Sequence, residues 1–313
     1  MTAAFARDVA DGFARAPKSV PARWLYDDLG SALFEAICRL PWYRITRAEE
    51  ALLDRHGVDV FDALPGDLEI VELGGGHGEK LDLLLAAGTR TRRTAAVRLI
   101  DISSAALDLA KARIEGREAV SAVHTTRGTY EPALASLPPT TASRLVLFLG
   151  SNIGNFDPRD AIAFLRHLCH AAGPRGAVLL GVDLVKPEAE LLLAYDDPLQ
   201  VTAAFNRNLL ARMNRDLGAD FPLDAFAHQA AWIPGASRIE MRLVASRAVD
   251  VVIPAAGVSS RLDAGEWIWT ESSYKYTPQE IDAMAGEAGL EGGLQWIDPA
   301  AQFALTLLRP RGR

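Results

Sequence analysis

"VELGGGHGEK", residues 71–80, joins an apolar run to a helix through a turn that is rich in glycine. The run that leads into it, LEIVEL at 68–73, is short and apolar enough for a buried strand. The residues that follow carry apolar side chains at helical spacing, at Leu81, Leu84 and Leu85. Strand, glycine turn and helix together predict the first βα unit of an α/β sheet.

Strands and helices continue to alternate after this turn. In order, the pattern predicts a strand at 95–103, a helix at 104–114, a strand at 142–151, a helix at 158–172 and a strand at 176–185. Alternation at this spacing predicts a doubly wound, Rossmann-like sheet with parallel strands. A last apolar segment, FALTLLR at 303–309, predicts the closing strand.

Elsewhere the pattern is different. Helices are predicted at 3–16, 31–39, 188–197 and 201–218, and antiparallel strands within 237–253. We therefore expect one α/β domain, 48–184 with 275–313, interrupted by an insertion. The insertion, 185–274, is expected to pack with residues 1–47 as an α+β substrate-binding domain.

Two helix starts have recognisable caps. Thr46 and Glu49 fit the T-x-x-E capping box, which predicts a helix that begins at Thr46. Thr277 precedes Pro278 and Glu280, which predicts an N-cap followed by proline at the first helical position and an acid at the third.

Composition limits the kind of protein. The chain has 313 residues, 49% hydrophobic and 23% charged, with a net charge of −7, two cysteines and no basic cluster. These values are those of a globular protein without a nucleic-acid partner, and no apolar run is long enough for a membrane span or a secretory signal. Two isolated cysteines fit the reducing cytoplasm. The histidines show no metal-ligand spacing, so no metal is expected.

The glycine turn has the form E-x-G-x-G-x-G, made by Glu72, Gly74, Gly76 and Gly78. In an open α/β sheet a ligand lies beyond the carboxyl ends of the strands, and glycines let it approach the backbone closely. Neither glycine register gives the G-x-G-x-x-G of a dinucleotide site, which disfavours a nicotinamide oxidoreductase. An acid before the glycines, with Asp101 ending the next strand, suits an ammonium group and a ribose. The pattern predicts S-adenosylmethionine (SAM) in a class I methyltransferase; a tight turn without a ligand is the plainer alternative.

A second informative stretch is EWIWTESSYKYTP at 266–278. Glu271 and Ser273 are two positions apart, so on a strand they share one face. That face is either solvated or the wall of a polar pocket. Other residues fit core packing as well as a site when each is taken singly: Tyr26, Tyr43, Tyr195 and Met241.

Five segments together resemble one family, the amino-acid Nα-methyltransferases that convert histidine to its betaine, hercynine, in ergothioneine biosynthesis. The segments are PKSVPARWLYDDLGSALFEAICRLPWYRITRAE, FLGSNIGNF, GVDLVK…LLLAYDD…VTAAFNRNLL, RIEMRL and TESSYK. They are long, unusual and in the same order, and the resemblance covers almost the whole chain.

The resemblance implies a set of site residues. The substrate carboxylate would be held by Asn155 and Tyr195, the amino group would lie near Tyr26 and the carbonyl of Gly150, and the imidazole would contact Tyr43, Met241, Glu271 and Ser273. Tyr26, Gly150 and Asn155 are the catalytic candidates among them. SAM would be bound by Tyr26, Glu72, Gly74, Gly76, Lys80, Asp101, Thr129 and Tyr130. Thr129 stands where the family commonly has an Asp, so the adenine is expected to meet backbone groups or the Thr129 hydroxyl.

The activity implied is transfer of methyl groups from SAM to the α-amino nitrogen of L-histidine, up to trimethylation, leaving S-adenosyl-L-homocysteine. Glu271 and Ser273 could serve the two nitrogens of an imidazole, whereas an indole has a single nitrogen, so histidine is favoured over tryptophan. Another aromatic or modified amino acid is the alternative substrate, and a SAM-binding regulator without catalysis is an alternative of a different class. We expect a cytoplasmic monomer.

Overall fold

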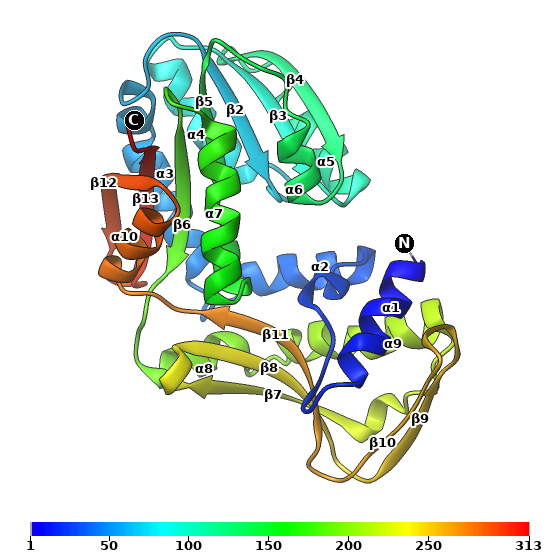
Figure 1. The fold of residues 1–313 in the computed structure, drawn as a ribbon. Helices are drawn as coiled ribbons and strands as arrows, with labels where there is room; N and C mark the ends of the chain where they lie inside the picture. The colour runs from blue at the N-terminus through cyan, green and yellow to red at the C-terminus, as the bar shows by residue number, and fades with distance from the viewer. Residues whose placement is uncertain (1, 313) are drawn as a thin grey trace. The chain divides into compact units, whose positions relative to one another are not determined.

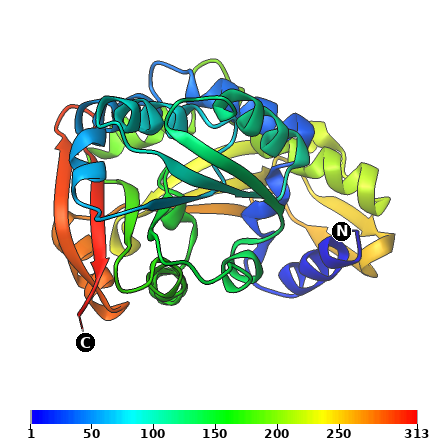
Figure 2. The ribbon, with the colours of Figure 1, turned by 90° about the horizontal axis from the view of Figure 1, so that it is seen from above.

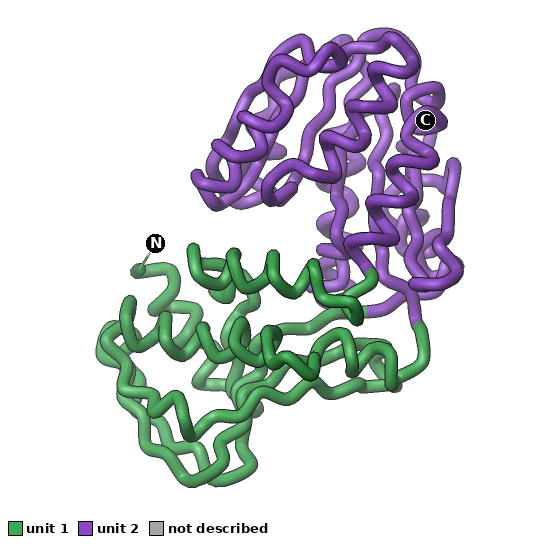
Figure 3. Tube along the Cα trace, turned by 180° about the vertical axis from the view of Figure 1, so that it is seen from behind, with its two compact units in different colours: residues 1–44, 186–274 green, residues 45–185, 275–313 purple. Residues whose placement is uncertain are grey.

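The computed structural model describes residues 2–312, and the chain forms two compact units, coloured separately in Figure 3. Unit 1 contains residues 1–44 and 186–274, and unit 2 contains residues 45–185 and 275–313. The units divide the chain at 44/45, 185/186 and 274/275. The boundaries drawn from the sequence are 47/48, 184/185 and 274/275.

Unit 2 is built from alternating strands and helices (Figure 1). Its strands are β2 (Leu68–Leu73), β3 (Ala95–Asp101), β4 (Val120–Arg127), β5 (Ser143–Phe148), β6 (Ala177–Asp183), β12 (Leu290–Asp298) and β13 (Phe303–Pro310). Its helices are α3 (Ile45–Asp62), α4 (Glu79–Arg90), α5 (Ser104–Ile114), α6 (Tyr130–Ala135), the short 3-10 helix η2 (Asn152–Asn155), α7 (Pro158–Ala172) and α10 (Pro278–Glu287).

One seven-stranded sheet, in the order β12-β13-β6-β5-β2-β3-β4, forms the centre of unit 2. The five strands from β4 to β6 are parallel, and β13 pairs antiparallel with both of its neighbours. Helices cover both faces, with α3 packed on α4 and α10 packed on α7 (Figures 1 and 2). Every residue of β2, β5 and β6 is buried as a result. The predicted doubly wound α/β sheet is confirmed.

Strands β4 and β12 of this sheet are not predicted from the sequence. Both lie at the edges of the sheet, and most of their side chains are exposed or half-buried. An edge strand with exposed side chains needs no apolar run, so the hydrophobic pattern that reveals β2 and β6 is missing from it.

Unit 1 combines helices with a smaller sheet. Its helices are α1 (Thr2–Phe13), η1 (Ala22–Leu25), α2 (Asp28–Cys38), α8 (Glu188–Tyr195), α9 (Val201–Leu217), η3 (Leu223–Ala225), η4 (Pro234–Ala236) and η5 (Pro254–Ala256). Its strands are β1 (Lys18–Ser19), β7 (Phe226–Ile233), β8 (Arg238–Ala245), β9 (Val249–Ile253), β10 (Val258–Leu262) and β11 (Trp267–Tyr274). Strands β1-β11-β8-β7 form one sheet, against which α8 and α9 pack, while β9 and β10 form a separate hairpin.

The helix starts agree with the sequence in one case and differ in another. At α10 the predicted cap is confirmed, because Thr277 accepts the backbone N–H of Glu280 and the Glu280 side chain bonds back to Thr277. Helix α2 begins at Asp28, earlier than predicted, because Asp27 accepts the N–H of Gly30 and caps it. Among residues 2–312, none of the helices has the length and apolarity that a bilayer crossing requires.

The capping box predicted for Thr46 and Glu49 is wrong. Helix α3 already includes Ile45, so Thr46 lies inside it. Glu49 is completely buried, and its carboxylate bonds to the backbone N–H of Gly150. The acid at this position therefore serves a distant segment of unit 2 and not its own helix end.

Candidate functional site

The glycine turn at the carboxyl end of β2 has three residues in left-handed backbone conformations. Gly74, Gly76 and Gly78 have φ angles of 62°, 56° and 74°, which residues with a Cβ rarely adopt. Gly74 also needs its small size, since a Cβ there would lie 2.2 Å from the hydroxyl oxygen of Tyr130. Two of the residues predicted to bind SAM are thus in close contact at the edge of the sheet.

Glu72 lies beneath this turn with its carboxylate against Gly75. A Cβ on Gly75 would be 2.2 Å from Oε2 of Glu72, and this oxygen has no hydrogen-bond partner among the described residues. Burial raises the pKa of Glu72 to about 7; Lys80 acts to lower it, and Asp101 acts to raise it further. A buried carboxyl oxygen without a partner is costly, and a ligand with a cationic or N–H group would relieve that cost. The residues present therefore fit a cofactor that carries an ammonium group.

Asp101 and the segment after β4 complete this edge. Asp101 ends β3 and accepts the backbone N–H of Ser103 at 2.8 Å, and burial raises the pKa of its carboxyl. Tyr130 begins α6, and its pKa is raised by burial and by the Asp101 charge, so its hydroxyl stays protonated. Thr129 directly precedes it as an exposed N-cap residue whose side chain makes no capping hydrogen bond.

Lys80, predicted to bind SAM, and Gly150, predicted to lie near the substrate amino group, both contact one carboxylate, that of Glu49. Lys80 forms an ion pair with Glu49, and both Glu49 oxygens lie 2.9 Å from the N–H of Gly150. No functional role is predicted for Glu49 from the sequence. One signal in it was available, because Gly181 in the middle of buried β6 leaves the space that the Glu49 carboxylate fills.

The turn after β5 carries the remaining predicted residues of unit 2. Gly150 and Ser151 are both left-handed, with φ of 73° and 59°, and Oγ of Ser151 accepts the N–H of Asp183 at 2.9 Å. Asn155 is exposed and ends η2, the 3-10 helix that follows this turn. Asp157, which directly precedes α7, is the N-cap residue of that helix.

In unit 1, a β-bulge decides which way Glu271 and Ser273 face. Trp269 pairs with Arg242 and Glu271 pairs with Met241, so Thr270 is the extra residue. Before the bulge the even-numbered Ile268 is buried; after it the buried side chains include Ser273 and not Ser272.

The outer face of the same strands is occupied differently. The guanidinium of Arg242 stacks over Trp267 at 4.6 Å and that of Arg238 over Trp269 at 4.4 Å, while Glu240 bonds to both arginines. The bulge thus leaves the two tryptophans on the outer face and puts Glu271 and Ser273 on the inner face, although only a few residues separate them in the sequence.

The predicted substrate residues of unit 1 do come together on the inner side. The hydroxyl oxygen of Tyr195 lies 2.8 Å from Oγ of Ser273, and the Tyr195 ring packs edge-on against Tyr43 at 6.2 Å. Burial raises the pKa of Tyr43 well above its ordinary value, with Tyr195, Tyr26 and Glu271 among the further contributors, so Tyr43 is neutral. Tyr26 packs edge-on with Phe34 and Phe205.

Asn206 and His228 support this cluster and were missed, because no spacing in the sequence relates them to it. Asn206, on α9, accepts the Thr270 hydroxyl at 2.7 Å and contacts Nδ1 of His228 at 2.9 Å, and Nε2 of His228 lies 2.8 Å from the Tyr195 carbonyl. Burial lowers the pKa of His228, with Arg207 acting in the same direction and Asp196 against it. A neutral ring fits both partners, since Nε2–H donates to the carbonyl while Nδ1 accepts from the amide.

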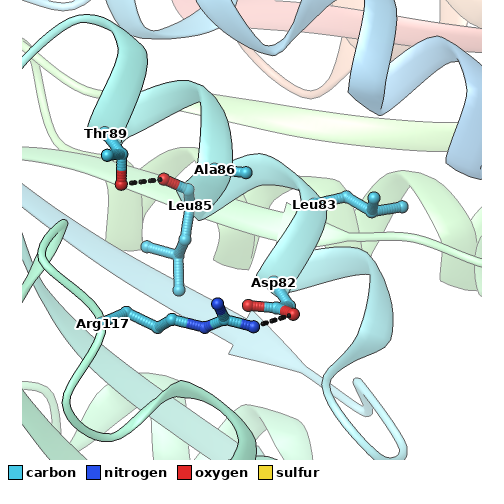
Figure 4. Close-up of a pocket in the computed structure, with 6 residues that line it drawn as sticks. All are labelled: Asp82, Leu83, Leu85, Ala86, Thr89 and Arg117. Carbon is cyan, nitrogen blue, oxygen red and sulfur yellow. Dashed lines mark hydrogen bonds and ion pairs between the residues drawn. The ribbon is translucent and has the colours of Figure 1, made fainter.

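A surface hollow on unit 2 carries none of the predicted site residues. It is lined by Asp82, Leu83, Leu85, Ala86, Thr89 and Arg117 (Figure 4). Asp82 and Arg117 form a 2.7 Å ion pair across it, and the Thr89 hydroxyl bonds to the Leu85 carbonyl. Both of these interactions satisfy groups of the protein itself, so the hollow is not a candidate site.

The chemistry at the carboxyl edge of the large sheet identifies the class of protein. The group left without a partner beneath the glycine turn is a carboxylate, which would repel a pyrophosphate and attract a cation. With the doubly wound sheet and its antiparallel closing strand, this edge is that of a class I SAM-dependent methyltransferase.

Comparison with known proteins gives the family. Residues 5–310 match the family described as histidine-specific methyltransferase, SAM-dependent, and the chain belongs to it. It is 41% identical to the histidine N-alpha-methyltransferase of Mycolicibacterium smegmatis, covering 97% of this chain and 94% of that one. The enzyme of the same name from Mycobacterium tuberculosis is 40% identical with the same coverage. Ergothioneine biosynthesis protein 1 of Neurospora crassa is 28% identical over 90% of this chain, which spans 32% of that longer protein.

Proposed function

We propose that this methyltransferase transfers methyl groups from SAM to the α-amino nitrogen of L-histidine, ending at the trimethylated betaine, hercynine. The names of its relatives support the substrate and a place in ergothioneine biosynthesis. The net charge of −7 supports a small-molecule substrate and no nucleic-acid partner, and we propose a cytoplasmic monomer.

The observation that carries the substrate is the polar cluster on the inner side of β11. Glu271 and Ser273 share that side, and Ser273 is hydrogen-bonded to Tyr195. An imidazole donates from one nitrogen and accepts at the other, so it can engage a carboxylate and a hydroxyl together. An indole has one donor and no acceptor, and would satisfy only one of them. This difference favours histidine over tryptophan.

The same cluster supplies neutral groups for the rest of the amino acid. The Tyr195 hydroxyl is a neutral group that can donate to the substrate carboxylate without the desolvation cost of a buried cation. Tyr43 stays protonated because burial raises its pKa, so it serves as a neutral wall and not as a base. Met241, only 2% exposed, is available to pack against the ring.

The amino group must be unprotonated and close to the methyl group that it receives. The carbonyl of Gly150 can accept one amine N–H and so aim the nitrogen lone pair. Positioning of this kind supplies much of the rate in a displacement at carbon. When bound, SAM supplies an activated methyl group on a sulfonium.

On the cofactor side, each residue has a separate task. Asp101 can accept hydrogen bonds from both ribose hydroxyls, and the glycines leave room for the backbone to approach. Glu72 and Lys80 face the amino-acid end, where one acid and one ammonium complement an ammonium and a carboxylate. Thr129 and Tyr130 are available at the adenine end.

The test is mass spectrometry of products after incubation with SAM and each of the twenty amino acids. We expect histidine to be consumed in preference to the others, with successive additions on the α-nitrogen and a trimethylated end product. Nα-acetylhistidine, which keeps the imidazole but blocks the amine, should remain unmodified. Preference for tryptophan, tyrosine or a modified amino acid, or methylation of the ring nitrogens, would overturn the proposal.

A further inference from the structure

We propose that Glu49 is a positioning residue that couples the cofactor end of the unit 2 site to the methyl-acceptor end. The inference rests on the proposed function for the roles of Lys80 and Gly150. The contacts of Glu49 with these two residues are independent of it.

Glu49 is buried, ion-paired and hydrogen-bonded within unit 2. Its side chain is completely buried, and its two oxygens share the Gly150 N–H while Oε2 also meets the Lys80 ammonium. A buried carboxylate persists only when it is paired and hydrogen-bonded. Space for it is made by Gly181, where a Cβ would lie 1.8 Å from Oε1.

The Gly150 carbonyl is fixed through this contact. The peptide that carries this carbonyl lies between two anchored points. The N–H of Gly150 donates to Glu49, and the Ser151 hydroxyl accepts the N–H of Asp183. Ser151 is left-handed with φ of 59°, a conformation that a residue with a Cβ keeps only where its surroundings hold it in place. Without Glu49 the first anchor is lost, and the carbonyl can rotate away from the amine that it orients.

Lys80 is fixed through the same carboxylate. The Lys80 side chain is 20% exposed, so it can reach a ligand while its charge is balanced from below. A Cβ on Gly150 would lie 3.4 Å from Nζ of Lys80, which puts the ammonium directly beside the turn. Movement of Lys80 when it binds the cofactor would therefore shift the turn at Gly150.

The experiment is a double-mutant cycle on S-adenosylhomocysteine affinity, measured by calorimetry with wild type, Glu49→Gln, Lys80→Gln and the double variant. We expect each single change to weaken binding by about tenfold or more, as for charge-assisted hydrogen bonds. The double variant should lose far less than the product of the two losses. Multiplicative losses would show that the two residues act independently and would overturn the coupling.

Two further variants separate positioning from a purely structural role. Glu49→Asp keeps the charge but shortens the side chain, so it should bind S-adenosylhomocysteine nearly as well as wild type while kcat falls about tenfold or more, because the Gly150 contact is lost. Asp54→Asn, on the exposed side of the same helix and paired with Arg90 at 3.7 Å, should change neither quantity. If Glu49 variants lose only thermal stability, with affinity and kcat unchanged below the unfolding temperature, the proposal fails.

The cycle also distinguishes this failure from that of the proposed function. Binding of S-adenosylhomocysteine needs no amino acid, so the Glu49–Lys80 coupling is measured even if histidine is not the substrate. A wild type that methylates another amino acid would change the identity of the acceptor, and the Glu49→Asp loss of kcat would then be measured on that acceptor.

Discussion

Replacing Glu72 with Gln should stabilise the cofactor-free protein above neutral pH. Glu72 is 3% exposed, its Oε2 has no hydrogen-bond partner among the described residues, and burial raises its pKa to about 7. In the unfolded chain the same carboxyl has the ordinary value of 4.5. Gln has nearly the same shape and no charge, so it removes the cost of ionising a buried acid.

The size of the effect follows from proton linkage. Between pH 4.5 and about 7 the folded state holds the Glu72 proton while the unfolded state has lost it, so stability falls as pH rises through this window. At ~1.4 kcal/mol per pH unit, the full loss is about 3 kcal/mol. Glu72→Gln should therefore unfold roughly 5–10 °C above wild type at pH 8, with the difference shrinking towards pH 4.5.

The assay is thermal unfolding of both proteins without cofactor across this pH range. Glu69→Gln is a matched control, because Glu69 lies on the same strand and is buried but is paired with Arg98 and Arg144, each at 2.6 Å. These arginines help to lower the pKa of Glu69, so its ionised form stabilises the fold above pH 4.5 and the Gln variant should be less stable at pH 8.

A second readout is proton release on ligand binding. SAM brings positive charge to Glu72 and favours its ionised form, so binding near pH 7 should release protons from wild type and not from Glu72→Gln, measured by calorimetry in buffers of different ionisation enthalpy. If Glu72→Gln follows the wild-type pH dependence of stability without a change of slope, the account of Glu72 as a strained buried acid is refuted.

Three more predictions test other parts of the two units. Ser273→Ala should raise KM for histidine roughly three- to tenfold by removing a buried hydrogen bond, while Ser272→Ala on the opposite face of the strand should not; equal effects would contradict the assigned face. Asp101→Ala should weaken SAM binding about tenfold or more in a calorimetric titration and leave KM for histidine at saturating SAM little changed, and an unaltered SAM affinity would remove the ribose role. Burial lowers the pKa of His228, so its neutral form stabilises the fold at and above its ordinary pKa of 6.5 and this contribution is lost as pH falls through the lowered value. His228→Gln, which can keep both hydrogen bonds to Asn206 and the neighbouring carbonyl, should lose less unfolding temperature on acidification from pH 7 to 5 than wild type does.

The sequence by itself determined the central strands of the large sheet and the glycine turn at their carboxyl ends. Apolar runs such as 68–73 and 177–183 become strands because a sheet covered on both faces requires continuous burial, which is a local pattern. The glycines at 74, 76 and 78 predict a turn with left-handed backbone, and this too is a local pattern. The α10 cap is likewise contained within four consecutive residues, Thr277 to Glu280. Patterns that depend on neighbours in the chain can be predicted from the chain.

What only the tertiary structure decided is which polar group each buried side chain meets. Glu49 matches a helix cap by its spacing from Thr46, yet its partner, Gly150, is 101 residues away. Strict alternation would put Trp269 and Glu271 on one face of β11. The bulge at Thr270, whose hydroxyl bonds to Asn206 on α9, instead turns Glu271 to the opposite face. Hydrogen-bond partners that come from distant segments are fixed by packing, and local spacing carries no record of them.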